Sequence, residues 1–175
     1  IWLAIAVIAL LGVRPVQAGD LETRVKAAYL YNFTKFVEWP NAVDPGAAQG
    51  PFTLAVLGPE QISSALASLQ QKLVQGRPLQ ILQVDCDAPL PAVDMLYVAT
   101  KDPDKAACML SSIDTRPVLT IGESRNFIHA GGLINFYRKG KKIRFEINAQ
   151  AARESGFKIS SQLLKLARIV ESEAP

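Results

Sequence analysis

Apolar residues recur at three- and four-residue steps near the start of the chain. Between residues 20 and 40, Val25, Tyr29, Phe33 and Phe36 fall on one side of a helical wheel. This spacing predicts an amphipathic helix, and Pro40 ends it because the residue before a proline disfavours helical geometry. We expect the aromatic stripe to pack against the core of the domain.

Polar residues at the start of the same helix support the prediction. Asp20 is suited to cap it, and Glu22 and Lys26 stand four residues apart, the spacing of an ion pair along a helix. Tyr31 falls off the apolar stripe and Trp39 lies at the helix end. These two aromatic residues are therefore candidates for a partner-binding surface, since aromatic anchors dominate many interfaces.

The rest of the chain alternates between short apolar runs and helical stripes. Runs at 52–58, 79–84, 94–100 and 117–122 are typical of buried strands, with helices predicted at 60–73 and 103–113 and a short helix or turn at 124–129. Segments 133–137 and 143–147 flank a turn and predict a hairpin. A short helix at 149–154 and a last helix at 160–170 follow. This order indicates a three-layer α/β domain, a mostly parallel sheet completed by an antiparallel C-terminal hairpin and flanked by helices.

The first residues have the pattern of an export signal. Residues 1–11 are uniformly apolar, too few to span a bilayer, and small residues stand at Val16 and Ala18. We interpret 1–18 as a signal peptide truncated at its start and 19–175 as one exported domain. An internal core helix is the alternative, but Arg14 and Pro15 would end it abruptly.

Composition narrows the class of protein further. The net charge of +3, with basic residues spread along the chain, does not favour nucleic-acid binding. Two cysteines occur, Cys86 and Cys108. In an exported protein such a pair is a candidate disulfide, worth about 3 kcal/mol by loop closure. Two unrelated buried thiols are the alternative.

Motifs for catalysis and cofactor binding are incomplete. The first strand is followed by "GPEQIS", which lacks the glycines of a dinucleotide-binding turn. "GESRN" resembles a nucleophile elbow for three residues, and His129 lies too close in sequence to Ser124 to serve as its base. Asp85 and Asp87 are a weak signal for a cation and fit a solvated turn better. We therefore expect no catalytic residue, no metal site and no cofactor.

Five basic residues gather around the hairpin turn: Arg138, Lys139, Lys141, Lys142 and Arg144. Such charges can simply protect a sheet edge from pairing with another molecule. They can also form a patch for an acidic partner, an anionic ligand or a lipid surface. The hairpin is therefore a second candidate partner-binding surface.

Five motifs together resemble the YfiR family of periplasmic regulatory proteins. They are "VKAAYLYNFTKFVEWP", "FTLAVLG", "VLTIG", "GGLINFYRKGKKIRFEIN" and "AARESGFKISSQLLKLARIV", in this order over nearly the whole mature chain. The resemblance implies a compact α/β fold with a Rossmann-like sheet, often as a homodimer. It also implies two cysteine pairs, one of which supports folding, whereas this chain has a single pair.

The resemblance implies regulation rather than catalysis. Family members repress a membrane-bound diguanylate cyclase of the YfiN type by binding its periplasmic domain, which lowers c-di-GMP and biofilm formation. An outer-membrane lipoprotein of the YfiB type sequesters them. The alternative is a periplasmic small-molecule sensor that binds its ligand at the carboxyl ends of the strands and presents it to another membrane receptor, such as a sensor kinase.

Overall fold

The computed structural model describes residues 18–40, 50–113 and 116–171. The predicted signal peptide, apart from Ala18, lies outside the described residues, as do 41–49 of the predicted linker after the first helix. Among the helices of the described ranges, none is both long and apolar enough to cross a bilayer.

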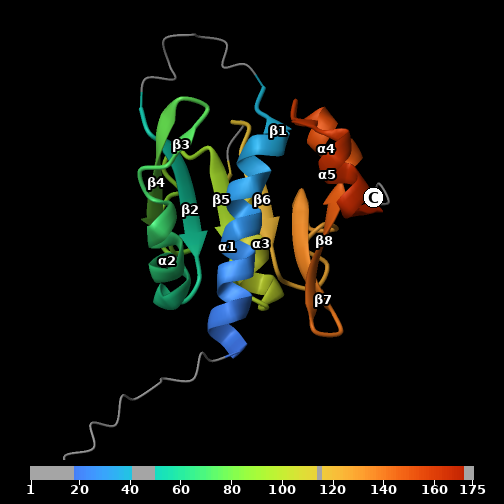
Figure 1. The fold of residues 1–175 in the computed structure, drawn as a ribbon, viewed down its shortest axis with the longest axis horizontal. Helices are drawn as coiled ribbons and strands as arrows, with labels where there is room; N and C mark the ends of the chain where they lie inside the picture. The colour runs from blue at the N-terminus through green and yellow to red at the C-terminus, as the bar shows by residue number, and fades with distance from the viewer. Residues whose placement is uncertain (1–17, 41–49, 114–115, 172–175) are drawn as a thin grey trace, which may run out of the picture.

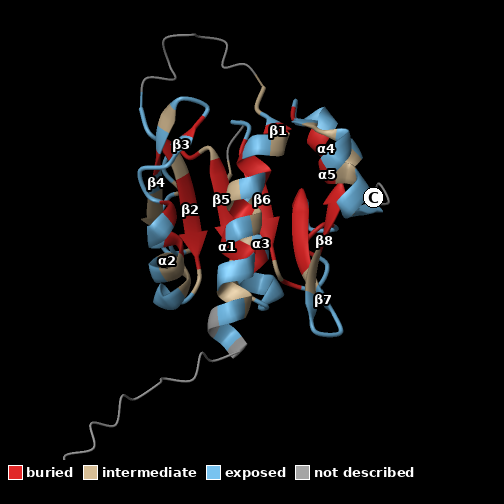
Figure 2. Cartoon of the chain, viewed as in Figure 1, coloured by how far each residue is buried: buried red, intermediate tan, exposed pale blue. Residues whose placement is uncertain are grey.

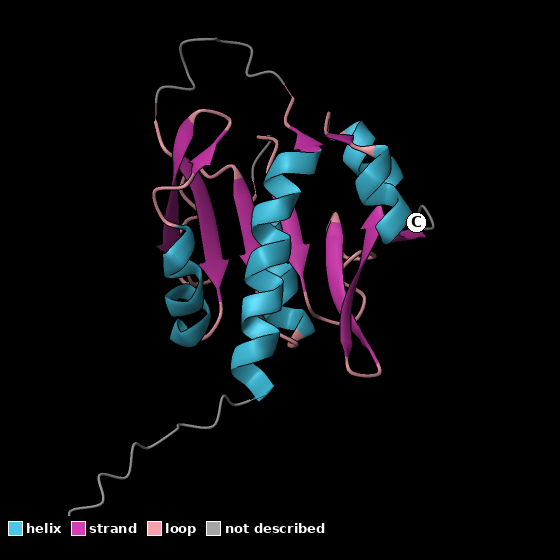
Figure 3. Cartoon of the chain, viewed as in Figure 1, coloured by secondary structure: helices cyan, strands magenta, loops and turns pink. Residues whose placement is uncertain are grey.

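A central sheet organises the described part of the chain, in which eight strands follow the order β10-β8-β7-β6-β5-β2-β4-β3 (Figures 1 and 3). Its strands are β2 (Phe52–Leu57), β3 (Leu73–Val74), β4 (Arg77–Gln83), β5 (Met95–Val98), β6 (Leu119–Gly122), β7 (Ile134–Lys139), β8 (Lys142–Asn148) and β10 (Arg168–Val170). Strands β4, β2, β5, β6 and β7 are parallel, and β8 turns back antiparallel to β7. The predicted fold class is confirmed.

Helices cover both faces of this sheet. Helices α1 (Ala18–Phe36) and α2 (Glu60–Leu66) contact each other, and Figure 1 shows α1 running across one face with α3 (Pro103–Ser111) behind the sheet. Neighbouring residues of one strand serve opposite layers: Leu54 and Val56 join the core beneath α1, while Ala55 joins the core beneath α3. Figure 2 shows the buried colour concentrated in the strands. The uniformly apolar strands are thus explained, because both faces are covered.

Several predicted boundaries are wrong at the edges of the fold. The helix expected at 60–73 stops at Leu66, continues as the 3₁₀ turn η1 (Ala67–Leu69), and is followed by β3. The last helix, α5 (Ser161–Leu166), also stops early because Ala167 is extended, with ψ 155°. Residues Arg168–Val170 form β10 instead, parallel to β8. The helical spacing of the leucines cannot predict this strand, because its hydrogen-bonding partner β8 comes beside it only in the folded sheet.

Small elements lie at the end of the molecule opposite the β7–β8 turn (Figure 1). Strands β1 (Val37–Glu38) and β9 (Lys158–Ile159) pair antiparallel, and α4 (Ala149–Glu154) connects β8 to β9. Asn148 caps α4 by accepting a hydrogen bond from the Ala151 amide (2.9 Å), and the Ser160 hydroxyl accepts one from the Leu163 amide at the start of α5. Asn and Ser are favoured at this position because their side-chain oxygen satisfies a free amide of the first helical turn.

The aromatic stripe seats α1 on the sheet. Phe33 is fully buried, and its ring lies 5.1 Å from Phe145 and 5.9 Å from Phe136, centroid to centroid. Tyr29 is half-buried and contacts the same two rings. The prediction that this stripe packs against the core is confirmed, and it brings the first half of α1 beside the β7–β8 hairpin.

A phenylalanine wedge fixes the loop that follows β6. The Phe127 ring lies against two glycines, so that an added Cβ would stand 2.3 Å from it at Gly122 and 2.2 Å at Gly132. The Gly132 amide also donates to the Phe127 carbonyl (2.9 Å). Residues 123–131 are therefore held as a compact turn at the carboxyl end of β6.

We predict that Gly132→Ala lowers the free energy of unfolding by about 2 kcal/mol, because a methyl group must displace a packed ring and nearby backbone. Chemical denaturation of the purified variant measures this. Gly50→Ala is the matched control, since nothing lies within 4 Å of a Cβ there. Equal stability of the two variants would contradict the wedge.

Candidate functional site

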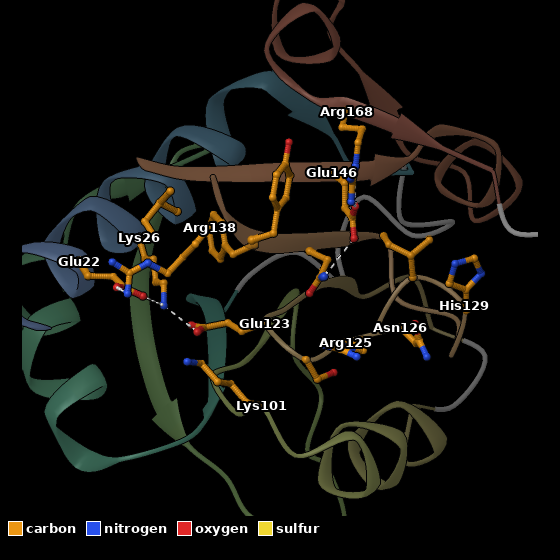
Figure 4. A pocket seen from close by; sticks show the side chains of 16 residues that line it. Glu22, Lys26, Lys101, Glu123, Arg125, Asn126, His129, Arg138, Glu146 and Arg168 are labelled. Carbon is orange, nitrogen blue, oxygen red and sulfur yellow. Dashed lines mark hydrogen bonds and ion pairs between the residues drawn. The ribbon is translucent and has the colours of Figure 1, made fainter. Parts of the chain in front are cut away.

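A groove of about 640 Å³ lies at the carboxyl ends of β5 and β6. Its walls come from the first half of α1, the turn after β6, and the β7–β8 hairpin, which extends beyond this edge (Figures 1 and 4). We name it the edge groove. Its polar lining includes Glu22, Lys26, Glu123, Ser124, Asn135 and Glu146.

Lys26 occupies the end of the edge groove nearest α1. It is 7% exposed, and its ammonium lies 2.8 Å from Glu22 and 2.6 Å from Glu123. A buried charge is tolerated only when it is paired, and these two carboxylates provide the pairing. Lys26 therefore ties α1 to the loop after β6, and the helical pair with Glu22 predicted from the sequence is confirmed.

Glu123 also joins the core through Tyr97. The phenol of Tyr97 donates a hydrogen bond to Glu123, and burial, followed by the charge of Glu123, raises the pKa of Tyr97 well above its ordinary value. Glu22 has the opposite shift. The hydrogen bond from Lys26 lowers its pKa, burial opposes this, and the charges of Lys26, Arg138 and Lys101 add to the lowering.

A second polar group forms the far wall of the edge groove, across three neighbouring strands. Asn135 of β7 donates from Nδ2 to Glu146 of β8 (3.1 Å), and Arg168 of β10 donates from Nε to the same carboxylate (3.0 Å). Figure 4 shows Arg168 and Glu146 side by side above the groove. Asn135 Oδ1 and Ser124 Oγ are both buried and have no hydrogen-bond partner among the described residues.

The residues of the partial elbow motif do not form a catalytic pair. Ser124 is 1% exposed, whereas His129 is exposed, although both residues line the edge groove. Ser124 Oγ has no partner within the described chain, so no base is hydrogen-bonded to it. Asn126 takes the left-handed conformation, with φ 64°, which asparagine tolerates. Within the described ranges, no group of three or more metal-binding side chains gathers.

Four of the five basic hairpin residues line a second groove, of about 840 Å³, between α1 and the hairpin. We name it the basic groove. Leu21, Val25, Tyr29 and Ile143 supply its apolar surface, and Arg138, Lys141, Lys142 and Arg144 supply its positive charge. Glu22 also lines it and lies 3.4 Å from Arg138. Lys139 instead lines a separate hollow beside Leu166 and Arg168. Lys142 and Arg144 line both of these surfaces.

The two candidate aromatic anchors lie elsewhere. Trp39 donates from its indole nitrogen to the Asp94 carbonyl (2.9 Å) and packs edge-on against Phe52 and Phe157. Tyr31 is half-buried, and its ring is covered by the ammonium groups of Lys35 at 4.4 Å and Lys72 at 5.0 Å. Both residues therefore have contacts within the domain, away from the basic groove, and their part in partner binding stays a prediction.

Cys86 and Cys108 lie close together as free thiols. Burial, a hydrogen bond with Cys108 and the nearby carboxylates of Asp85 and Asp87 raise the pKa of Cys86 to about 11. The disulfide is therefore not formed in this structure, although the two predicted residues are neighbours. A raised pKa keeps the thiolate scarce, which slows exchange reactions at neutral pH.

Sequence reasoning missed most of the edge groove. In the sequence pattern Glu123 belongs only to the partial elbow motif, and Asn135 and Glu146 belong only to the predicted hairpin. One signal was available: both are polar residues on strands whose neighbours are apolar, and the hairpin register pairs them directly. Arg168 reaches Glu146 only because residues 168–170 form β10, whereas the spacing of the leucines predicts a helix there.

We predict that Lys26→Met lowers the free energy of unfolding by about 3 kcal/mol, because Glu22 and Glu123 lose the cation between them. Denaturant titration measures the loss. Adding Glu123→Gln to Lys26→Met should recover part of it. Lys105→Met, an exposed substitution on α3, is the control. A loss of unfolding free energy no larger than that of Lys105→Met would contradict the buried pairing.

We predict that Glu22 stabilises the fold above its unfolded pKa and not in acid. A carboxyl group whose pKa is lowered by folding contributes stability that is lost as pH falls through the folded value. The difference in unfolding free energy between the native chain and Glu22→Gln should thus be constant near neutrality and shrink below about pH 4.5. A difference that grows in acid would contradict the assignment.

No curated protein matches the chain. A conserved domain protein from Vibrio cholerae O1 biovar eltor shares the fold, with a TM-score of 0.56 and 11% identity over 84% of this chain and 59% of that one. The ABC domain in complex with L-Trp from Streptococcus pneumonia has a TM-score of 0.45 and 14% identity, over 67% of this chain and 55% of that one.

This chain covers less than two thirds of the length of either solved protein. The likeness to the first concerns the fold alone. The sequence itself is more specific. The pattern of one family, described as YfiR/HmsC-like, extends from residue 23 to residue 168, through α1, the sheet and the hairpin, and this protein therefore belongs to the YfiR/HmsC-like family.

Proposed function

We propose that this protein is a periplasmic regulatory binding protein that represses a membrane-bound diguanylate cyclase of the YfiN type. It does so by associating with the periplasmic domain of the cyclase, which lowers c-di-GMP and biofilm formation. Membership of a family of regulators rather than enzymes supports the class of function. The observation that carries the proposal is the basic groove.

The basic groove has the two features of a protein-docking surface. Its apolar surface is open to solvent, with Leu21 60% and Val25 36% exposed. Its rim carries the exposed cations Arg138, Lys141 and Lys142. Apolar area buried on binding supplies affinity, and the charged rim steers an oppositely charged partner into register.

An acidic amphipathic helix of the cyclase fits this surface. Such a helix places its apolar residues in a groove at helical spacing and its carboxylates toward a basic rim. Docking need only favour the inactive arrangement of the cyclase, and a differential affinity of a few kcal/mol shifts such an equilibrium strongly. The protein then acts by stoichiometric binding.

The remaining expectations belong to the same proposal. They are export to the periplasm, a homodimer, sequestration by an outer-membrane lipoprotein of the YfiB type, and a disulfide between Cys86 and Cys108. Exposed Leu166 and Ile169, at 65% and 48%, lie at the β10 edge and offer apolar surface for a second copy.

We predict that the double reversal Lys141→Glu and Lys142→Glu weakens binding to the purified periplasmic domain of the cyclase by about tenfold or more, mainly through slower association. Surface-based kinetics at two salt concentrations measures this, and the loss should be smaller at high salt. Cells that carry the variant should contain more c-di-GMP, as should cells in which the gene is deleted.

Lys105→Glu on α3, across the sheet from the basic groove, is the matched control and should leave affinity unchanged. Two results contradict the proposal. One is unaltered c-di-GMP in the deletion strain, and the other is equal affinity of the native and charge-reversed proteins for the cyclase domain.

One observation favours the alternative function, a periplasmic small-molecule sensor that presents its ligand to another membrane receptor such as a sensor kinase. The edge groove contains two buried polar atoms, Ser124 Oγ and Asn135 Oδ1, that no described residue satisfies.

A further inference from the structure

Two unsatisfied polar atoms in one groove point to an occupant. Ser124 is 1% exposed and Asn135 is 5% exposed, and both residues line the edge groove. A buried polar atom without a hydrogen bond destabilises a fold, so such atoms are rare and are retained where they serve binding or catalysis. Here two occur in the same groove.

The hydrogen bonds around Asn135 define what it needs. Its Nδ2 already donates to Glu146, which also accepts from Arg168, so this arrangement fixes the orientation of the amide. Oδ1 can therefore only accept, and it requires an N–H or O–H group. Ser124 Oγ can donate or accept, and the wedge of Phe127 holds its turn in place.

Charges along the groove indicate an anion. Glu22, Glu123 and Glu146 are each already engaged by a cation of the protein. Lys101 and Arg125 also line the groove, and no ion pair to either is formed by the described residues. Figure 4 shows these two side chains on the wall opposite Arg168. They are available for a negatively charged ligand.

We propose that the edge groove binds a small carboxylate that also bears hydroxyl groups. The carboxylate lies against Lys101 and Arg125, one hydroxyl donates to Asn135 Oδ1, and another pairs with Ser124 Oγ. A volume of about 640 Å³ suits a molecule of metabolite size rather than one bound water. Three carboxylates in the walls favour a singly charged group over a phosphate dianion.

The edge groove adjoins the basic groove and shares Glu22, Arg138 and Ile143 with it. Ser124, Arg125 and Asn135 line the edge groove alone, so the inference does not depend on the cyclase as partner. It deepens the sensor alternative by naming a class of ligand. A hydroxylated carboxylate would complete the hydrogen bonds that Ser124 Oγ and Asn135 Oδ1 lack, and its binding would stabilise the folded state.

Three probes separate the features that the ligand needs. D-gluconate has a carboxylate and hydroxyls, hexanoate has the carboxylate alone, and glucose has the hydroxyls alone. Isothermal titration of the purified protein should detect gluconate at concentrations up to about 10 mM, with hexanoate and glucose at least about tenfold weaker. Glycerol 3-phosphate, titrated as a fourth probe, tests the preference for a singly charged group. Equal binding of gluconate and hexanoate, no binding of gluconate, or tighter binding of glycerol 3-phosphate than of gluconate would overturn the proposal.

Substitution of Ser124 tests whether its unpaired hydroxyl serves ligand binding or the stability of the fold. Ser124→Ala removes a buried hydroxyl without a partner, so the melting temperature without ligand should stay the same or rise, while gluconate affinity falls about tenfold. Ser111→Ala, an exposed serine on α3, should change neither. A lower melting temperature with unchanged affinity would assign Ser124 to structure and overturn the proposal.

Arg125→Gln provides a second variant on an exposed side chain, where folding is not at risk. It should weaken gluconate binding about tenfold and leave the melting temperature unchanged. In a crystal structure with gluconate, the ligand should contact Asn135 and Ser124. A water bridging those two atoms that gluconate does not displace would overturn the assignment.

Discussion

The ammonium of Lys26 is the constraint on which the functional end of the molecule depends. A buried cation must have carboxylates within reach, and here they come from its own helix and from the loop after β6. This fixes the position of α1 along the sheet as well as its rotation. The aromatic stripe also holds α1 against the sheet, but apolar contacts are less directional than a paired charge and fix the position of the helix less tightly.

Both grooves follow from that placement. The β7–β8 hairpin extends beyond the carboxyl edge of the parallel strands, and the first half of α1 lies beside it. One space opens between helix and hairpin, with apolar and basic walls. The other opens beneath the hairpin and is lined by Glu123 at one end and by Asn135 and Glu146 on the far wall. A surface for a macromolecule and a hollow for a small molecule thus share the hairpin as a wall.

Local pattern predicted the layers and the main elements, because apolar spacing reports which faces are covered. It also predicted the Glu22–Lys26 pair, whose members are neighbours on one helix. It failed where a residue's surroundings come from distant segments. Trp39 lies at a helix end in the sequence, and only the fold brings Asp94 and Phe157 into contact with it. Arg168 looked like part of a helix, and only the sheet makes it a strand residue beside Glu146.

Strand β10 gives the fold a mechanical consequence. It is a short edge strand held to β8 over three residues, and the Arg168 guanidinium at its start is a partner of Glu146 in the wall of the edge groove. Displacement of this strand would release Glu146 and, through it, the amide of Asn135. A ligand that binds Asn135, as proposed above, would therefore be linked to the attachment of β10, and by thermodynamic reciprocity each would shift the other.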